Sequence, residues 1–249
     1  MGSGWQTAGV RDGERAARQY DAMGSRYAVD NDEGAFNAYY ERPATISLIE
    51  PVDGLRVLEV GCGGGHLTEW LVERGADVTA FDVSPVMLRL ARRRVGDRAT
   101  FLLADASAPL EFAADNSFDL VVASLVLHYI ADWRPVLREF RRVLRSDGAV
   151  VCSTHHPTMD WEIGGGDYFD SRLITQTWRK GGRDFDVTFW RRPLTAITDA
   201  VSESGFVIER LVEPRPSDVL RSRDLEVYEL LTSEPMFLFF RLKPSVRHS

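Results

Sequence analysis

The sequence predicts an α/β fold in which helices cover both faces of a doubly wound, mostly parallel sheet of seven strands. Two observations carry this prediction. Short, almost continuously apolar segments alternate with amphipathic segments of helical spacing between residues 57 and 154, and that alternation is typical of successive βαβ units. The first unit also has a dense run of glycines directly after its strand, where such folds bind ligands.

The first unit combines a strand, a glycine turn and a helix. Residues 57–60 favour a strand and lead directly into Gly61, Gly63 and Gly65. A helical pattern follows at once, and we expect it to stop at Gly75. Glycines let the backbone approach a ligand at positions where a Cβ atom would collide with it. The segment is therefore the ligand-binding corner of a Rossmann-like unit.

The other strands follow in regular order. Ser84 and Pro85 are typical of an N-cap and a first helical position, and Asp132 caps a later helix. Residues 118–124 are almost continuously apolar, as a parallel strand buried on both faces should be. The expected strands after the first are residues 76–82, 100–103, 118–124, 149–154, 206–211 and 236–242.

The alternation breaks after residue 154. Residues 174–178 and 185–190 alternate around a turn that contains two glycines, which predicts a β-hairpin in an aromatic-rich insertion. Because the insertion follows the fifth strand, we interpret it as a lid that faces a substrate; a packing flap or a dimer contact is the alternative. We expect a single domain over 1–249, with a helical cover at 14–50, a ligand-binding core at 51–154, the lid at 155–192, and a helix and last strands at 193–249.

Composition limits the classes of function. The 249 residues are 44% hydrophobic and carry a net charge of −7, which argues against a nucleic-acid partner. Cys62 and Cys152 fall in a turn and a strand, so we expect no disulfide and a reducing cytoplasm. No signal peptide is recognised, and the longest apolar run is too short to span a bilayer. We expect a cytoplasmic protein without a membrane partner, as a monomer or homodimer.

The surroundings of the glycines decide which ligand fits. A dinucleotide fingerprint would need its third glycine at position 66, where the sequence has His66. Glu59, two residues before Gly61, would repel a pyrophosphate at close range. The carboxylate suits a ligand that carries an ammonium and a sulfonium. This Glu-x-Gly-x-Gly-x-Gly pattern resembles motif I of the class I S-adenosylmethionine (SAM)-dependent methyltransferases.

Two later segments extend the resemblance. Residues 124–130, and a Leu-x-x-Phe-x-Arg-Val-Leu pattern over 137–144 followed by Gly148, are similar to the broad family of quinone and small-metabolite methyltransferases. Methyltransferases of nucleobases often carry an Asn/Asp-Pro-Pro-aromatic motif where this chain reads Ser-Leu-Val-Leu over 124–127, which disfavours DNA. The resemblance implies in-line methyl transfer from SAM to an O, N or C atom of a small aromatic or apolar metabolite, with S-adenosylhomocysteine (SAH) as product.

The resemblance also implies cofactor-binding residues. Asp82 follows Glu59 at about the spacing at which an acid binds ribose hydroxyls. The family uses an acid at the place of Asp105 for the adenine amine, and backbone carbonyls near Ser124 for the ligand's amino group. Helix caps or turns are the alternative for each residue. The expected cofactor residues are Tyr20, Tyr27, Glu59, Gly61, Cys62, Gly63, Asp82, Val83, Asp105, Ala106 and Ser124.

Methyl transfer itself demands mainly alignment and a dry pocket. A hydroxyl or ammonium acceptor also needs a base, and His128, His155 and His156 are the candidates because they follow the fourth and fifth strands. No cysteine or carboxylate stands at ligand spacing from the paired histidines, so we expect no metal. A SAM-binding fold without methyl transfer and a dinucleotide-dependent oxidoreductase remain as alternative functions.

Overall fold

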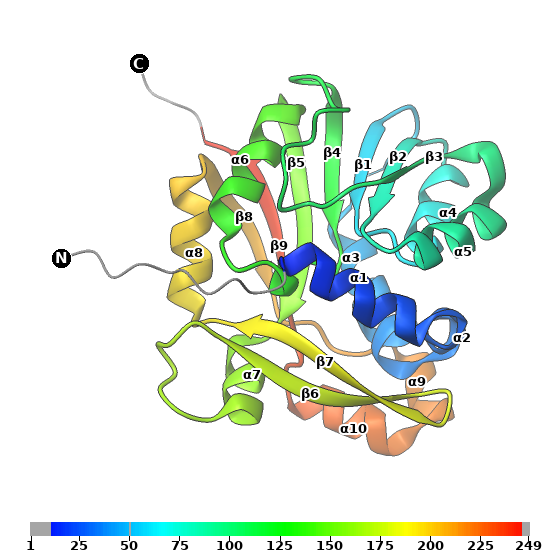
Figure 1. Ribbon diagram of the computed structural model, residues 1–249, viewed down its shortest axis with the longest axis vertical. Helices are drawn as coiled ribbons and strands as arrows, with labels where there is room; N and C mark the ends of the chain where they lie inside the picture. The colour runs from blue at the N-terminus through cyan, green and yellow to red at the C-terminus, as the bar shows by residue number, and fades with distance from the viewer. Residues whose placement is uncertain (1–10, 50, 246–249) are drawn as a thin grey trace.

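A sheet of seven strands forms the centre of the computed structural model, which describes residues 11–49 and 51–245. Strands β1 to β5 run parallel, while β9 is antiparallel to both of its neighbours (Figure 1). The predicted doubly wound, mostly parallel sheet is therefore confirmed. In spatial order the strands are β3 (Thr100–Leu103), β2 (Asp77–Asp82), β1 (Arg56–Val60), β4 (Phe118–Ala123), β5 (Leu144–His155), β9 (Phe237–Pro244) and β8 (Phe206–Val212).

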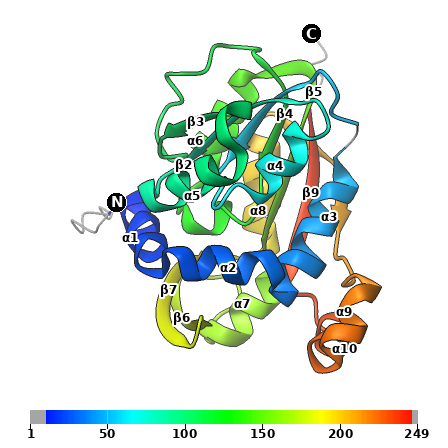
Figure 2. The ribbon, with the colours of Figure 1, turned by 90° about the vertical axis from the view of Figure 1, so that its right-hand side faces the viewer.

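Helices cover both faces of this sheet (Figures 1 and 2). Leu58 packs with α6 (Trp133–Val143) and α8 (Leu194–Glu203) on one face. Its neighbour Val57 packs on the other face, because successive strand residues point to opposite sides. That second face carries α3 (Arg42–Leu48), α4 (His66–Val72) and α5 (Pro85–Val95). Burial on both faces explains why the core strands are almost continuously apolar.

A second, two-stranded sheet lies beyond the carboxyl ends of the parallel strands (Figure 1). Its strands β6 (Arg172–Lys180) and β7 (Arg183–Arg191) form the predicted hairpin and are joined by Gly181 and Gly182, both with positive φ. Such two-residue turns match the twist of paired strands. The hairpin packs against α1 (Asp12–Met23) through Met23, Val187 and Phe189.

Direct hydrogen bonds reinforce this packing. The backbone N–H of Thr188 donates to Gln19 Oε1 at 2.7 Å, and the indole of Trp190 donates to Asp12 Oδ1 at 3.0 Å. Lys180 of the hairpin also pairs with Asp30 of α2 (Ser25–Glu33). The N-terminal cover and the aromatic insertion therefore form one layer over the edge of the sheet.

The structure differs from the predicted boundaries in the N-terminal cover. The helical region expected over 14–50 is divided at Gly24, whose φ is +54°, and it contains a π-helical segment, Asn37–Glu41, before α3. Residue 50 lies outside the described residues. A wider turn in the middle of a helical region depends on tertiary contacts, so the local periodicity carried no sign of it.

The later boundaries also shift. Residues 213–235 contain α9 (Asp218–Arg223) and α10 (Leu225–Ser233) rather than a loop with one short helix, and Ser217 and Asp224 cap them. An unpredicted helix, α7 (Pro157–Gly164), follows β5, which itself begins before the expected Ala149. Two 3₁₀ turns complete the fold, η2 (Gly96–Arg98) and η3 (Leu127–Tyr129).

Membrane-spanning helices, metal-binding groups and cysteine pairing can be assessed for residues 11–49 and 51–245 as a whole. No helix in these residues is long and apolar enough to cross a membrane. No group of three or more His, Cys, Asp or Glu side chains in them is arranged to hold a metal ion. Cys62 and Cys152 are both buried and free.

Candidate active site

Two adjoining cavities lie at the carboxyl edge of the parallel strands. The first cavity is lined by the glycine turn after β1 and by the ends of β2, β3 and β4. The second cavity lies between the N-terminal cover, η3, α7 and the hairpin. Their common wall, which belongs to the lining of both, consists of Tyr20, Tyr27, Asn37, Leu125 and Tyr129.

The glycine turn packs closely against Val126 at Gly61 and faces open space at Gly63. Gly61 has a φ of +67°, and a Cβ atom there would lie 2.4 Å from Val126 Cγ2. Gly63 has a φ of +53°, and its missing Cβ would meet no atom within 4 Å. A side chain at Gly61 would strain the turn, and one at Gly63 would project into open space beside the cavity. The turn thus leaves room for a ligand against its backbone.

Glu59 is a buried carboxyl group at the floor of the first cavity. Only 4% of the residue is exposed, and the Thr68 hydroxyl donates to its Oε2 at 2.6 Å. Burial raises the Glu59 pKa to about 8, with a further contribution from Asp82 and opposition from the Thr68 hydrogen bond. A positive charge brought into the cavity would therefore stabilise the ionised form of Glu59.

Asp82 holds the turn and the start of α5 together. Its Oδ2 accepts from the Gly63 N–H at 2.9 Å and its Oδ1 from the Ser84 N–H at 2.8 Å. Burial raises its pKa to about 6, while these backbone hydrogen bonds oppose the rise. Each carboxylate oxygen can accept more than one hydrogen bond, so Asp82 retains capacity for ligand hydroxyls.

Asp105 both stabilises a turn and lines the first cavity. Its Oδ1 accepts from the N–H and the hydroxyl of Ser107 at 2.8 and 2.7 Å. Its Oδ2 lies directly against Gly13 of α1, where a Cβ would come within 2.0 Å. The turn role that the sequence left as an alternative is therefore present at the cavity wall itself.

The predicted cofactor residues come together in the first cavity. They arise from α1, α2, the glycine turn and three strand ends, and the cavity lining contains all of them. Their role as ligands of a cofactor stays a prediction. The set comprises Tyr20, Tyr27, Glu59, Gly61, Cys62, Gly63, Asp82, Val83, Asp105, Ala106 and Ser124.

Glu41 is a site residue that the sequence reasoning missed. It ends the π-helical segment, is 5% exposed and lines the first cavity. Its Oε1 accepts from three hydroxyl groups, those of Thr45, Ser124 and Ser153, at 2.6, 2.7 and 2.8 Å. π-Helical turns are frequent at functional sites. The available signal was an acid inside an aromatic segment, Tyr-Tyr-Glu-Arg-Pro over 39–43.

Leu125 forms part of the common wall in an unusual conformation. Its φ is +51°, which is uncommon for a bulky residue. The Leu125 N–H donates to Ser153 Oγ at 2.9 Å, which fixes this conformation. Strained residues of this kind cluster at sites where the surrounding structure imposes them.

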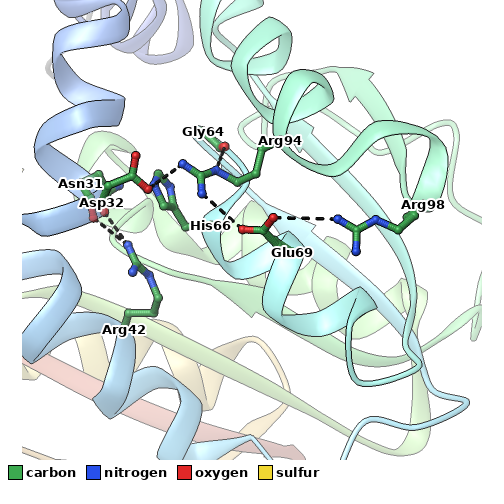
Figure 3. Close-up of polar contacts among 8 residues, drawn as sticks. All are labelled: Asn31, Asp32, Arg42, Gly64, His66, Glu69, Arg94 and Arg98. Atoms are coloured by element: carbon green, nitrogen blue, oxygen red, sulfur yellow. Dashed lines mark hydrogen bonds and ion pairs between the residues drawn. The ribbon is translucent and has the colours of Figure 1, made fainter.

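A charged network ties the cover to the glycine turn (Figure 3). Asp32 of α2 accepts from Arg94 at 2.6 Å and lies 2.6 Å from His66 Nε2. Arg94 also donates to the Gly64 carbonyl at 3.1 Å. Burial, and then the charges of Arg42 and Arg94, lower the His66 pKa to about 4. His66, the first residue of α4, is therefore neutral near pH 7 and lines the first cavity.

The three candidate histidines separate in the structure. His128 and His155 both line the second cavity, with ring centroids stacked 3.9 Å apart. His156 lies in neither lining. Its Nδ1 is 2.6 Å from Thr158 Oγ1 and its Nε2 is 2.8 Å from Glu213 Oε1, at the start of α7.

Two tyrosine hydroxyl groups of the common wall are hydrogen-bonded to each other. The Tyr20 and Tyr129 oxygens are 2.9 Å apart, and the Tyr20 and Tyr27 rings meet edge to face at 4.9 Å. Burial raises the pKa of each of these phenols well above its ordinary value. Their neutral hydroxyls therefore stand between the two cavities.

The fold and the glycine turn define a class I methyltransferase architecture, and comparison with known proteins agrees. Residues 58–152 match the family described as "Methyltransferase domain". A solved structure from Mesorhizobium loti, described as an S-adenosylmethionine dependent methyltransferase, superposes with a TM-score of 0.67 at 28% identity, covering 85% of this chain and 99% of that one. The chain therefore has the fold of class I SAM-dependent methyltransferases, and its residues 58–152 are similar to a methyltransferase domain.

Two curated relatives illustrate the similarity. The demethylmenaquinone methyltransferase of Renibacterium salmoninarum is 35% identical over 147 residues, which cover 58% of this chain and 61% of the relative. The ubiquinone biosynthesis O-methyltransferase of Idiomarina loihiensis is 28% identical over 226 residues, or 87% of this chain and 90% of the relative. At more than 30% identity, the chain spans between 30% and 61% of the length of several curated relatives.

Proposed function

We propose that this chain transfers the methyl group of SAM to a small-molecule acceptor, with SAM in the first cavity and the acceptor in the second. The observation that carries the proposal is the common wall of the two cavities. In-line displacement needs donor and acceptor atoms in contact and aligned. Adjoining cavities separated by a few side chains supply that arrangement.

The residues of the first cavity fit the cofactor. SAM supplies an electrophilic methyl group on a positively charged sulfur. Glu59 and Glu41 present buried carboxyl groups to a cationic ligand, and Asp82 retains acceptor capacity for the ribose hydroxyls. We infer that Asp105, which follows β3 and lines this cavity, accepts a hydrogen bond from the adenine amine, as the family resemblance implies. The open space beside Gly63 supports close approach of the ligand to the backbone.

We infer that the insertion over 155–192 acts as a lid on the acceptor. The hairpin and α7 contribute Trp178, Met159 and Ile163 to the second cavity. The hairpin packs on α1, and we infer that this cover excludes water from the reacting atoms and so strengthens electrostatic interactions inside the site. This assignment supports the expected division of the chain into a cover, a core and a lid.

The acceptor is proposed to be a small aromatic or apolar molecule, because aromatic and apolar side chains dominate the second cavity. The names of the quinone-pathway relatives support this class. The net charge of −7 supports the absence of a nucleic-acid partner. Two free cysteines suit a reducing cytoplasm, and we propose that the protein works there as a monomer or homodimer.

Calorimetric titration with SAM and with SAH tests the proposal. We expect wild-type protein to bind both ligands in the micromolar range and Asp82→Ala and Gly63→Val to lose binding. Asp77→Ala is the matched control, because Asp77 lies at the opposite, exposed end of the same strand. Unchanged affinity in both site variants would remove the assignment. Screening acceptors with a labelled methyl group then measures the transfer itself.

A further inference from the structure

The two histidines of the second cavity differ in what their ring nitrogens contact. Both nitrogens of His128 are sealed from solvent and have no hydrogen-bond partner among the described residues. Burial, the neighbouring His155 and Arg192 lower the His128 pKa well below its ordinary value. A neutral ring whose nitrogens are cut off from the cavity cannot exchange a proton with a ligand. His128 is therefore a stacking partner.

His155 has one occupied nitrogen and one free nitrogen. Its Nδ1 lies 3.3 Å from Asp160 Oδ1, and Asp160 is itself only 4% exposed. Within residues 11–49 and 51–245, Nε2 has no protein partner, and unlike the His128 nitrogens it is not sealed. A carboxylate beside Nδ1 favours the tautomer with the proton on that atom and stabilises the imidazolium. The lone pair of Nε2 is then left for a ligand.

Aromatic rings fix the plane of His155. The ring meets Phe189 edge to face at 4.4 Å and lies parallel to Phe237 at 5.8 Å, in addition to its stack on His128. These contacts leave the imidazole little freedom to rotate away from the cavity. The lining of the cavity also includes the aromatic and apolar residues Phe36, Met159, Ile163, Trp178 and Met236, besides the residues of the common wall.

We propose that His155 is the general base of the reaction, that Asp160 is its positioning residue, and that the acceptor is a hydroxyl group on an aromatic ring. The inference rests on the proposed function and names its substrate class. A base is needed only where the acceptor atom must lose a proton, which selects a hydroxyl over an amine that is already unprotonated. The apolar, aromatic walls select a flat ring to carry it.

Methyl transfer to this hydroxyl couples loss of its proton to displacement at the methyl carbon. His155 Nε2 takes the proton of the acceptor hydroxyl, and the resulting oxygen lone pair forms a bond to the methyl carbon. The bond between that carbon and sulfur breaks, and its electron pair stays on sulfur, which becomes the neutral thioether of SAH. The imidazolium, stabilised by Asp160, then returns its proton to solvent. No further reactant is required.

Several other charged and titratable groups lie near this ring. Asp160 lies beside Nδ1 of His155, and Arg192 is close enough to His128 and Asp160 for its charge to act on both. The remaining groups in the lining are Tyr20, Tyr27, Tyr129, Arg179 and Lys180.

The test uses 4-nitrophenol, an aromatic hydroxyl whose ionised form absorbs visible light. Protein saturated with SAH is titrated with 4-nitrophenol below the pH at which the free phenol ionises, and the phenolate band is recorded. We expect bound phenol to ionise in wild-type protein and in His128→Phe, and the bound phenolate band to be lost in His155→Phe. The two phenylalanine variants form a matched pair, because they replace either ring of one stack.

Two further variants guard against misfolding and test positioning. His155→Asn removes the base without adding an aromatic ring and should lose the band as well. Asp160→Asn should retain phenol binding but move the ionisation midpoint to higher pH, a shift that a purely structural role would not produce. Circular dichroism confirms the fold of each variant.

Each outcome decides a separate point. A phenolate band of equal strength in wild type and in both His155 variants overturns His155 as the base. Failure of 4-nitrophenol to bind while SAH binds overturns the aromatic hydroxyl as acceptor. Failure of SAH itself to bind overturns the proposed function, and this inference with it. A lost band in His128→Phe together with a retained band in His155→Phe reverses the assignment of the two rings.

Discussion

Glu41 and Ser153 are 112 positions apart in the sequence, yet the Ser153 hydroxyl donates to Glu41 Oε1 at 2.8 Å. Ser153 in turn accepts the N–H of Leu125. One carboxylate of the N-terminal cover therefore reaches the end of β5 and, through it, the strained residue that separates the two cavities.

Glu41→Ala should lower both stability and cofactor affinity. The buried hydroxyl groups of Thr45 and Ser153 and the half-buried one of Ser124 lose their acceptor, and an unsatisfied buried polar group costs about 1–3 kcal/mol. We expect a destabilisation of about 2–4 kcal/mol, since the hydroxyls can partly reorient, together with at least about tenfold weaker SAM binding. Thermal unfolding and calorimetry measure the two effects. Glu33→Ala, on the exposed end of α2, is the control, and a wild-type affinity in Glu41→Ala would contradict the prediction.

Asp32→Ala should weaken SAM binding with little loss of stability. The Asp32 side chain is 41% exposed, so its ion pair contributes less than about 1 kcal/mol to folding. Its removal nevertheless frees α2 from both His66 and Arg94 (Figure 3). Titrations at low and high salt should show that salt weakens binding to wild type more than to the variant. Arg98→Ala, at the far end of the same network, should behave like wild type.

Binding of a cationic ligand beside Glu59 should release a proton. The Glu59 pKa is raised to about 8 by burial, so the ligand-free protein holds this proton near pH 7 and a cation drives it off. Calorimetry in buffers with different ionisation heats measures the release, which should disappear above about pH 9 and in Glu59→Gln. Equal proton release in wild type and Glu59→Gln would refute the assignment.

The raised pKa of Glu59 also makes the stability of the ligand-free protein depend on pH. The folded pKa of Glu59 lies above its unfolded value, so the folded state retains a proton that the unfolded state has lost. In ligand-free protein the contribution of Glu59 to stability therefore falls as pH rises from about 4.5 through about 8. Chemical unfolding of wild type and Glu59→Gln across this range should show a decline in the wild type that the variant lacks.

Gln19→Ala should loosen the lid and spare the cofactor. It removes the side-chain partner of the Thr188 backbone. We expect limited proteolysis to cut the hairpin faster and the acceptor KM to rise several-fold, with SAM affinity within about twofold of wild type. Arg18→Ala, exposed on the same helix, is the control. An unchanged hairpin cleavage rate would show that other contacts hold the lid.

The sequence predicted the parts of the site that depend on local patterns. The glycine turn and the acids after β2 and β3 follow from period and spacing alone, because parallel strands bring their carboxyl ends to one edge. Glu41 escaped prediction because its partners Ser124 and Ser153 become neighbours only when the cover folds over the sheet.

The histidines show a different limit. His128 and His155 both follow core strands, and no local pattern distinguishes a sealed ring from an open one. Only the packing of η3, α7 and the hairpin around them separates the two environments. The helix α7 that brings Asp160 to His155 was itself absent from the prediction, because its eight-residue segment, Pro-Thr-Met-Asp-Trp-Glu-Ile-Gly, has weak helical periodicity.

The hydrogen bonds between Gln19 and Thr188 join α1, which contributes to the lining of the first cavity, to the hairpin, which contributes to the lining of the second. Binding of the cofactor in one cavity and of the acceptor in the other is therefore not independent. Because of these hydrogen bonds, we expect a displacement of α1 to be transmitted to the hairpin, and the reverse. Under the proposed function, we expect binding in one cavity to influence binding in the other.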